Sequence, residues 1–132
     1  MTGLIWFVQV VHYPLMALVG EAGYERYQLA HQRLTSLVVG PVMLLEAASA
    51  LVLLLRASQY GEAFRAMAYG GVGLLALVWL STFAVQVPLH ERLSRGFDAR
   101  VHRRLVHTNW VRTFAWSARG LLSLIMLAGA AG

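Results

Sequence analysis

Cysteine and lysine are both missing from this sequence, and acidic residues are scarce. Without a thiol, the chain can form no disulfide, use no thiolate nucleophile and offer no cysteine ligand to zinc or to an iron–sulfur cluster. Charged residues of either sign make up only 13% of the chain, whereas hydrophobic residues make up 58%. A soluble domain of 132 residues would need a far more polar surface, so the composition indicates a membrane protein.

Four long apolar stretches dominate the sequence, and its mean hydropathy is +0.60. Their lengths approach the roughly 17–25 residues that cross a bilayer as a helix. The sequence therefore predicts an all-α integral membrane four-helix bundle that forms a single domain over residues 1–132. The expected transmembrane helices cover about residues 4–20, 23–55, 64–89 and 108–130. The first is not expected to be a cleaved signal peptide, because polar residues between Gln9 and Pro14 interrupt its apolar core.

The arginines are distributed unevenly between the two sides of such a bundle. The connections 21–33 and 90–108 carry Arg26, Arg33, Arg92, Arg95, Arg100, Arg103 and Arg104, and the opposite side carries Arg56 and Arg65. Arginine-rich short loops stay in the cytoplasm. The pattern predicts a bacterial-type inner (cytoplasmic) membrane, with both termini outside and the two arginine-rich loops cytoplasmic. The expected partner is the lipid bilayer, including anionic headgroups, and no nucleic acid, which would need a contiguous exposed basic face.

A hairpin pattern recurs in the two halves of the chain. Gln9 and His31 are 22 residues apart, Gln86 and His107 are 21 apart, and the two glutamines are separated by 77 residues. The recurrence predicts two pseudo-repeated helical hairpins related by an axis along the membrane normal. The alternative is coincidence in a sequence built from few apolar residue types.

Each expected helix carries one polar stripe. The stripes are Gln9 and His12; His31, Thr35 and Glu46; Trp79, Thr82, Gln86 and His90; and Asn109, Arg112, Trp116 and Arg119. Steps of three and four residues place such side chains on one helical face. Lipid tails offer no hydrogen bonds, so the stripes must face one another. The sequence thus predicts a polar interior.

Two intramembrane charges need partners within that interior. A charge at the bilayer centre costs at least about 2.5–3.5 kcal/mol. Glu46 and Arg119 lie at comparable depths in helices that start from the same side, so they are expected to form an ion pair. The pair either serves function, as intramembrane ionisable residues often do, or only fixes the helix register.

The polar stripes supply the candidate functional residues. The candidates for catalysis are His12, His90, Arg112 and Glu46, and those for substrate binding are Gln9, Gln86, Asn109, Trp116 and Arg119. Arginine suits a developing oxyanion because it stays charged and offers a planar fork of donors. Histidine can move protons near neutral pH.

A metal site is a further expectation, with His12, His31, His90 and His107 as its ligands. Imidazole would suit a transition metal such as iron or copper, and haem fits less well because no two histidines obviously face each other at mid-depth. The chain lacks the HExxH and ExxH spacings of strong metal motifs, so hydrogen bonding in the interior is the competing interpretation. His102 is expected to be exposed within the basic stretch.

The phrase VQVPLH, a basic connection and then HTNWVRTFAW together resemble the small four-helix membrane protein family that includes the fungal anthrone oxygenases. That group has a VNVPLN-like phrase followed by Asn-x-x-Arg at the start of the last helix. The matching positions are Val85, Pro88, Leu89, Asn109 and Arg112, and this chain differs at Gln86 and His90. The resemblance implies oxygenation of a polycyclic phenol without an obvious cofactor.

Two functions of different classes follow from these observations. The first is a membrane-embedded oxidoreductase or oxygenase-like enzyme that acts on a lipophilic small molecule at the polar site, with or without a metal. The second is a small transport or proton-path protein, or an accessory subunit of a larger membrane complex. A homo-oligomer is expected in the second case, because four helices would form a path between protomers.

Overall fold

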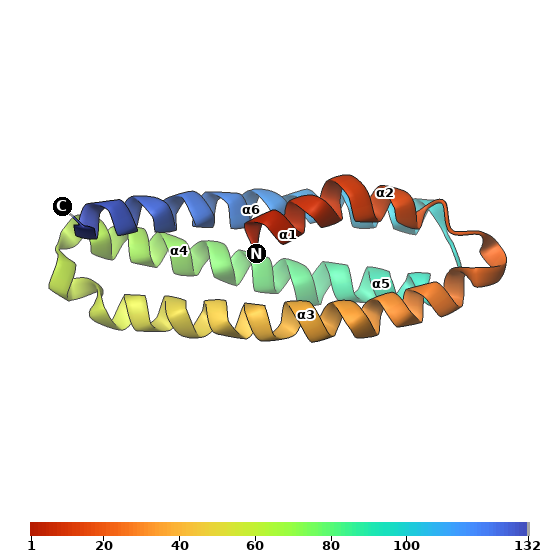
Figure 1. Ribbon diagram of the computed structural model, residues 1–132, viewed down its shortest axis with the longest axis horizontal. Coiled ribbons are helices and arrows are strands. Elements are labelled where there is room, and N and C mark those ends of the chain that lie inside the picture. Colours follow the sequence, from red (N-terminus) through yellow and green to blue (C-terminus); the bar gives the residue numbers. More distant parts are fainter. Residues whose placement is uncertain (132) are drawn as a thin grey trace.

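Four helical rods form the part of the chain that the computed structural model describes, residues 1–131, and this part contains no strand (Figure 1). The first rod joins α1 (Thr2–Phe7), the π-helical turn η1 (Val8–His12) and α2 (Tyr13–Met16). The second is α3 (Glu21–Arg56), followed by the 3-10 turn η2 (Ala57–Tyr60). The third joins α4 (Glu62–Ser81), the π-helical turn η3 (Thr82–Gln86) and α5 (Val87–Leu93), and the fourth is α6 (Ala99–Ala131). The prediction of an all-α four-helix protein is confirmed.

Two of the predicted helix boundaries were wrong. The first rod ends at Met16 rather than near residue 20, and α6 begins at Ala99 rather than near residue 108. The early start of α6 follows from Asp98, whose Oδ1 accepts hydrogen bonds from the backbone N–H groups of Arg100 at 2.7 Å and Val101 at 3.1 Å. Such a cap satisfies donors that the first helical turn leaves unpaired, so the basic stretch is helical despite its charge.

Two rods are long and apolar enough, by length and composition, to cross a membrane: Glu21–Tyr60 and Glu62–Leu93. The expectation of four such helices is therefore met by two. The first rod is short, and α6 carries Arg100, Arg103, Arg104, Arg112 and Arg119. The outer side of α3 exposes Leu29, Leu34, Leu37, Leu44, Leu45, Leu51 and Leu55.

The connections gather at the two ends of an elongated bundle (Figure 1). The α2–α3 and α5–α6 connections lie at one end, and the α3–α4 turn and the C-terminal end of α6 lie at the other. The first rod covers only the half nearest the arginine-rich connections, so Met1 lies midway along the bundle. Met1 and the C-terminal end of α6 therefore do not lie at the same end of the bundle (Figure 1). The sequence had predicted both termini on one side.

A proline shapes the first rod. Pro14 has no N–H group, so the carbonyl of Val10 loses its usual helical partner. The chain responds with one wider turn, in which the N–H of Tyr13 donates to the carbonyl of Val8, five residues earlier. Single π-helical turns of this kind are frequent at functional sites.

The third rod repeats this arrangement before Pro88. The N–H of Val87 donates to the carbonyl of Thr82, again five residues earlier. Ser81 and Gln86 are both buried although they are five residues apart, a step that would leave the buried face of a regular α-helix. The π-helical turn accommodates that step and keeps the Gln86 side chain directed inward.

The Asp98 cap gives a prediction about the start of α6. Backbone hydrogen bonds from Val101 and Arg100 lower the pKa of Asp98, so the cap stabilises the fold above the ordinary carboxyl pKa and is lost as the pH falls through the lowered value. We expect Asp98→Ala to lower the thermal unfolding midpoint at pH 7 and to have a smaller effect at pH 3. Asp98→Asn, which can still cap, is the matched control. An equal loss in both variants would contradict the capping role.

Candidate functional site

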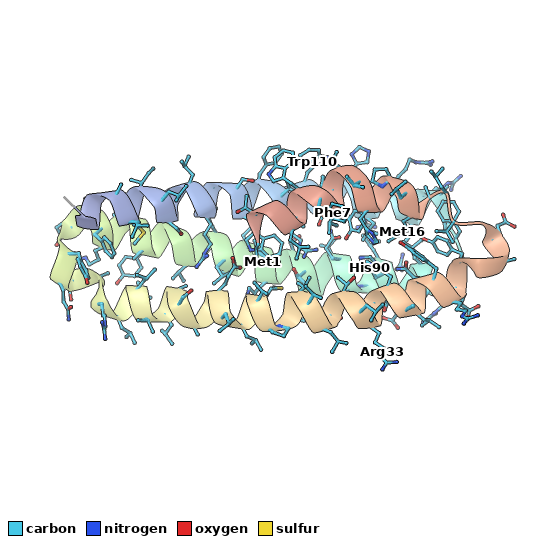
Figure 2. The ribbon with its side chains drawn as sticks, viewed as in Figure 1. Met1, Phe7, Met16, Arg33, His90 and Trp110 are labelled. Carbon is cyan, nitrogen blue, oxygen red and sulfur yellow. The ribbon has the colours of Figure 1, made fainter. Side chains whose placement is uncertain are left out.

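A cavity of about 330 Å³ lies between the first rod, α3 and the η3–α5 segment. Its polar wall is formed by Tyr13, His31, Thr35, Gln86, His90 and Arg112. Its apolar wall is formed by Leu4, Ile5, Val8, Val39, Met43 and Phe83. Figure 2 shows His90 in the space between α3 and the other rods, whereas Arg33 and Trp110 point away from the bundle. The cavity is therefore lined by both polar and apolar side chains, and its volume is within the range of small-molecule sites.

Arg112 is the charged group of the polar wall, and it is only 8% exposed. One guanidinium nitrogen donates to the side-chain oxygen of Asn109 at 3.3 Å, and the guanidinium carbon lies 5.0 Å from the centre of the Trp116 ring. Its Nε has no hydrogen-bond partner, and no carboxylate within the described residues pairs with it. The cation is consequently buried without a counter-ion, which favours an anionic or electron-rich group beside it.

Two buried amides hold Arg112 in place. Asn109 donates through its side-chain nitrogen to the Gln9 side-chain oxygen at 2.8 Å, so its own oxygen faces the guanidinium. Gln9 in turn donates to the carbonyl of Val106 at 3.2 Å. Gln9 and Asn109 were predicted to bind substrate, but neither lines the cavity. They position Arg112 instead.

Tyr13 and His90 form a hydrogen-bonded pair in the cavity wall, with 3.1 Å between the Tyr13 oxygen and His90 Nε2. The Gln28 amide nitrogen lies 2.8 Å from His90 Nδ1, so this nitrogen acts as an acceptor. A neutral His90 then carries its proton on Nε2 and donates it to the Tyr13 oxygen. Gln32 adds a hydrogen bond to the His90 carbonyl at 3.0 Å, which fixes the backbone at this point.

His12 and His31 form a second pair. Nε2 of His12 lies 3.0 Å from Nδ1 of His31, and the two ring centres are 4.6 Å apart. Two doubly protonated rings would point N–H groups at each other, so only one proton can lie between these nitrogens. The His31 ring is also 5.1 Å from the His90 ring, and Thr35 contacts His31 Nδ1 at 3.1 Å. The three imidazoles thus form a row that ends in the cavity wall.

The predicted ion pair between Glu46 and Arg119 is confirmed, with 3.7 Å between Oε1 and the guanidinium. Trp116 donates its indole N–H to the other carboxylate oxygen at 2.8 Å, and the Met1 amino group lies 3.9 Å from Oε1. Glu46 is therefore already engaged and does not neutralise Arg112. None of Glu46, Trp116 and Arg119 lines the cavity, although the sequence placed them among the catalytic and substrate-binding residues.

The expectation of a four-histidine metal site is corrected. His107 is exposed on α6, away from the row formed by His12, His31 and His90. Among residues 1–131, no group of three or more histidine or acidic side chains is arranged to hold a metal ion. The physical reason is that both His90 nitrogens and the facing nitrogens of His12 and His31 form hydrogen bonds with one another or with their neighbours.

Several residues of the site were missed in the sequence. Gln28 lies about one helical turn before His31, and Gln32 directly follows His31, so the pattern contained a signal for both. His102 was expected to be exposed, yet it is buried and its Nε2 lies 2.9 Å from the Tyr13 carbonyl. The buried residues His102, Leu105 and Asn109 are spaced by three and then four residues, so they lie on one face of α6.

Comparisons with known proteins give no match: no family model, no curated protein and no solved structure matches this chain. The resemblance that Val85, Pro88, Asn109 and Arg112 suggest stays a prediction. The function has to be inferred from the cavity and from the residues that line it.

The Glu46–Arg119 pair gives a prediction about folding. We expect Glu46→Gln and Arg119→Gln each to destabilise the protein, by up to about 3–5 kcal/mol, because each leaves a largely buried charge without its partner. The double variant should recover part of the loss. The measurement is the unfolding midpoint in detergent.

The matched control is the exposed pair of Glu62 and Arg65, which lies on the surface of α4. Neutralising either member should change stability by no more than about 1 kcal/mol. Additive losses at Glu46 and Arg119, with no recovery in the double variant, would show that the two do not stabilise each other.

Proposed function

We propose that this protein is a membrane-embedded oxidoreductase of the oxygenase type that acts on a lipophilic phenol. One observation carries the proposal: the buried Arg112 guanidinium has no counter-ion and lines a cavity that is otherwise lined by many apolar side chains. A lipophilic molecule with one acidic or carbonyl oxygen matches both kinds of lining. The apolar wall would hold its rings, and the guanidinium would hold its oxygen.

The apolar exterior supports a membrane location. Beyond the two long apolar rods, we propose that α6 and the first rod also lie within the bilayer, because Arg112, Asn109 and Gln9 are turned inward. The arginine-rich end would face the cytoplasm of a bacterial-type inner membrane. This orientation is supported by the position of both arginine-rich connections at one end of the bundle (Figure 1).

A pseudo-repeat of two hairpins is part of the proposal. Its support comes from the prolines rather than from the glutamines: Pro14 and Pro88 are 74 residues apart, and each follows a π-helical turn. Each rod with such a turn is followed by an uninterrupted long helix, α3 or α6. Both hairpins therefore contain a π-helical turn before a proline, and a duplication of one hairpin would leave this kind of similarity.

The charges of the interior favour an anionic transition state. Arg119 is paired with Glu46, so the Arg112 charge remains for the ligand. Removal of a proton from a phenol, or from the CH2 group of an anthrone, which is conjugated to a carbonyl group, places negative charge on oxygen. A fixed guanidinium near that oxygen stabilises the charge as it develops, and it needs no reorganisation in a site shielded from water.

The histidines supply a proton acceptor. His90 faces the cavity and is hydrogen-bonded to Tyr13, and His31 lies beside it. Both His90 nitrogens already form hydrogen bonds, so His31 would take the substrate proton on Nε2, for which no hydrogen bond is found among the described residues. His12 could then receive a proton through its short contact with His31 Nδ1. On an anthrone-type substrate the balanced reaction converts one CH2 group and O2 into a carbonyl group and water. The anion that forms when the substrate loses its proton is the species that reacts with O2.

A proton path is the second candidate function, and the row of three imidazoles favours it. The row ends at the cavity, however. There, the cavity-lining residues Ile5 and Met43 pack with Val78 in an apolar cluster. A path across the whole bundle would have to pass this cluster, so the row is better suited to serve the cavity.

Arg112 is the residue whose replacement tests the proposal most simply. We expect Arg112→Gln to lower kcat/KM for anthrone about 10²–10³-fold in proteoliposomes, because one preorganised donor to the oxyanion is lost. Oxygen uptake and the absorbance of anthraquinone measure the reaction, with empty liposomes correcting for spontaneous oxidation. Arg112→Lys keeps the charge but loses the planar fork, so an intermediate rate is expected.

Arg103→Gln is the matched control, since Arg103 is exposed on the same helix and distant from the cavity wall. Its rate should equal that of the unmodified protein. Anthrone turnover that is unchanged in folded Arg112→Gln, or absent from the unmodified protein, would refute the proposed role.

His31 gives a separate prediction about proton transfer. We expect His31→Gln to lower the turnover number about 10²–10⁴-fold, because general-base catalysis by a positioned side chain contributes a factor of this size. His107→Gln replaces an exposed histidine on α6 and should leave the rate unchanged. Circular dichroism would verify that both variants are folded. Equal rates for the two variants would exclude His31 as the base.

A further inference from the structure

We propose that the ligand of the cavity carries a long apolar tail, which lies in a groove along the seam between α3 and α4. The inference rests on the proposed function and narrows its substrate class. The natural substrate would be a phenolic head with an acyl or isoprenoid tail, whereas a tailless molecule such as anthrone would occupy only the head cavity and would still react there.

A second cavity, also about 330 Å³, provides the groove. Ala47, Ala50, Leu51 and Leu54 line it from α3, and Val72, Leu75, Ala76 and Trp79 line it from α4. The small alanine side chains leave the space between the helices unfilled. The only polar side-chain atom among these residues is the indole nitrogen of Trp79, which is buried without a partner. Such a wall suits a hydrocarbon chain and does not suit a polar one.

The groove follows the polar cavity along both helices, and Met43 and Trp79 of the apolar cluster lie at the junction that a tail would pass. On α3 the cavity ends at Met43, and the groove begins at Ala47, one helical turn later. On the third rod the groove ends at Trp79, and the cavity begins at Thr82, again one turn later. The two hollows therefore lie on the same face of each helix, and α3 and α4 run side by side over this length (Figure 1).

The available length suits a lipid tail. On α3 the space for the tail extends from Met43 to Leu54, and 11 residues of helix span about 17 Å. One lipid tail spans about half of the roughly 30 Å hydrocarbon core, so a tail of membrane-lipid length would fit. The head would lie at Arg112 and His90, where the polar atoms are, and only hydrocarbon would remain for the groove.

The test compares two phenols that share a head and differ in their tails, 4-methylphenol and 4-dodecylphenol. Radiolabelled ligand binding is measured with purified protein in one detergent. Because the detergent itself takes up the longer phenol, the informative quantity is the difference between variants under identical conditions. Ala50→Phe fills the groove from α3, and Ala48→Phe adds the same ring at an exposed position of that helix.

We expect 4-dodecylphenol to bind the unmodified protein and Ala48→Phe equally, and to bind Ala50→Phe about tenfold or more weakly, because buried methylene groups are lost. Binding of 4-methylphenol should be the same in all three. Ala76→Phe fills the groove from α4, at a more exposed position, and should repeat the effect if Ala50→Phe does not fold.

The outcomes separate the two proposals. If 4-methylphenol binds and filling the groove from either helix leaves 4-dodecylphenol binding unchanged, the tail groove is refuted and the proposed function stands. If neither phenol binds the unmodified protein, both proposals are refuted. If the groove variants also lose 4-methylphenol, the groove is part of the head site, and the assignment of a separate tail site is overturned.

Discussion

Hydrogen-bond satisfaction among buried side chains is the constraint on which this bundle depends. Its exterior is largely apolar, so amides, imidazoles and guanidinium groups from different helices must find partners in the interior. The Asn109–Gln9 hydrogen bond joins α6 to the first rod, and the Gln28–His90 contact joins α3 to α5. These contacts fix the rotation of each rod about its own axis, which places one wall of polar groups along the cavity.

Arg112 is the residue whose interactions remain incomplete: its guanidinium is buried without a counter-ion, and its Nε has no hydrogen-bond partner. The proposed chemistry follows from this missing partner. Glu46 is engaged by Arg119 and by the Trp116 indole N–H, and the Trp116 ring also makes a cation–π contact with the Arg112 guanidinium. An aromatic face stabilises a cation less than a carboxylate does. The interior therefore retains an attraction for an oxyanion next to two histidines and a tyrosine, which is an arrangement suited to proton removal from a lipophilic acid.

The sequence predicted what depends on composition and helical phase. The four rods, the inward stripes and the Glu46–Arg119 pair all follow from the position of a polar residue on a helix. The sequence could not predict which stripes would be in contact, because rotation and offset between rods depend on packing. It therefore grouped His107 with the cavity histidines and overlooked His102. The sequence also could not predict the π-helical turns. A proline shows that one helical hydrogen bond is lost, but it does not show how the chain compensates for the loss.

The most direct measurement is an experimental structure of the protein with 4-dodecylphenol bound in lipid nanodiscs. The account predicts the phenol oxygen within about 2.7–3.2 Å of a guanidinium nitrogen of Arg112, and the alkyl chain between α3 and α4. A phenol oxygen directed away from Arg112, or a ligand bound only on the outer surface of the helices, would contradict it.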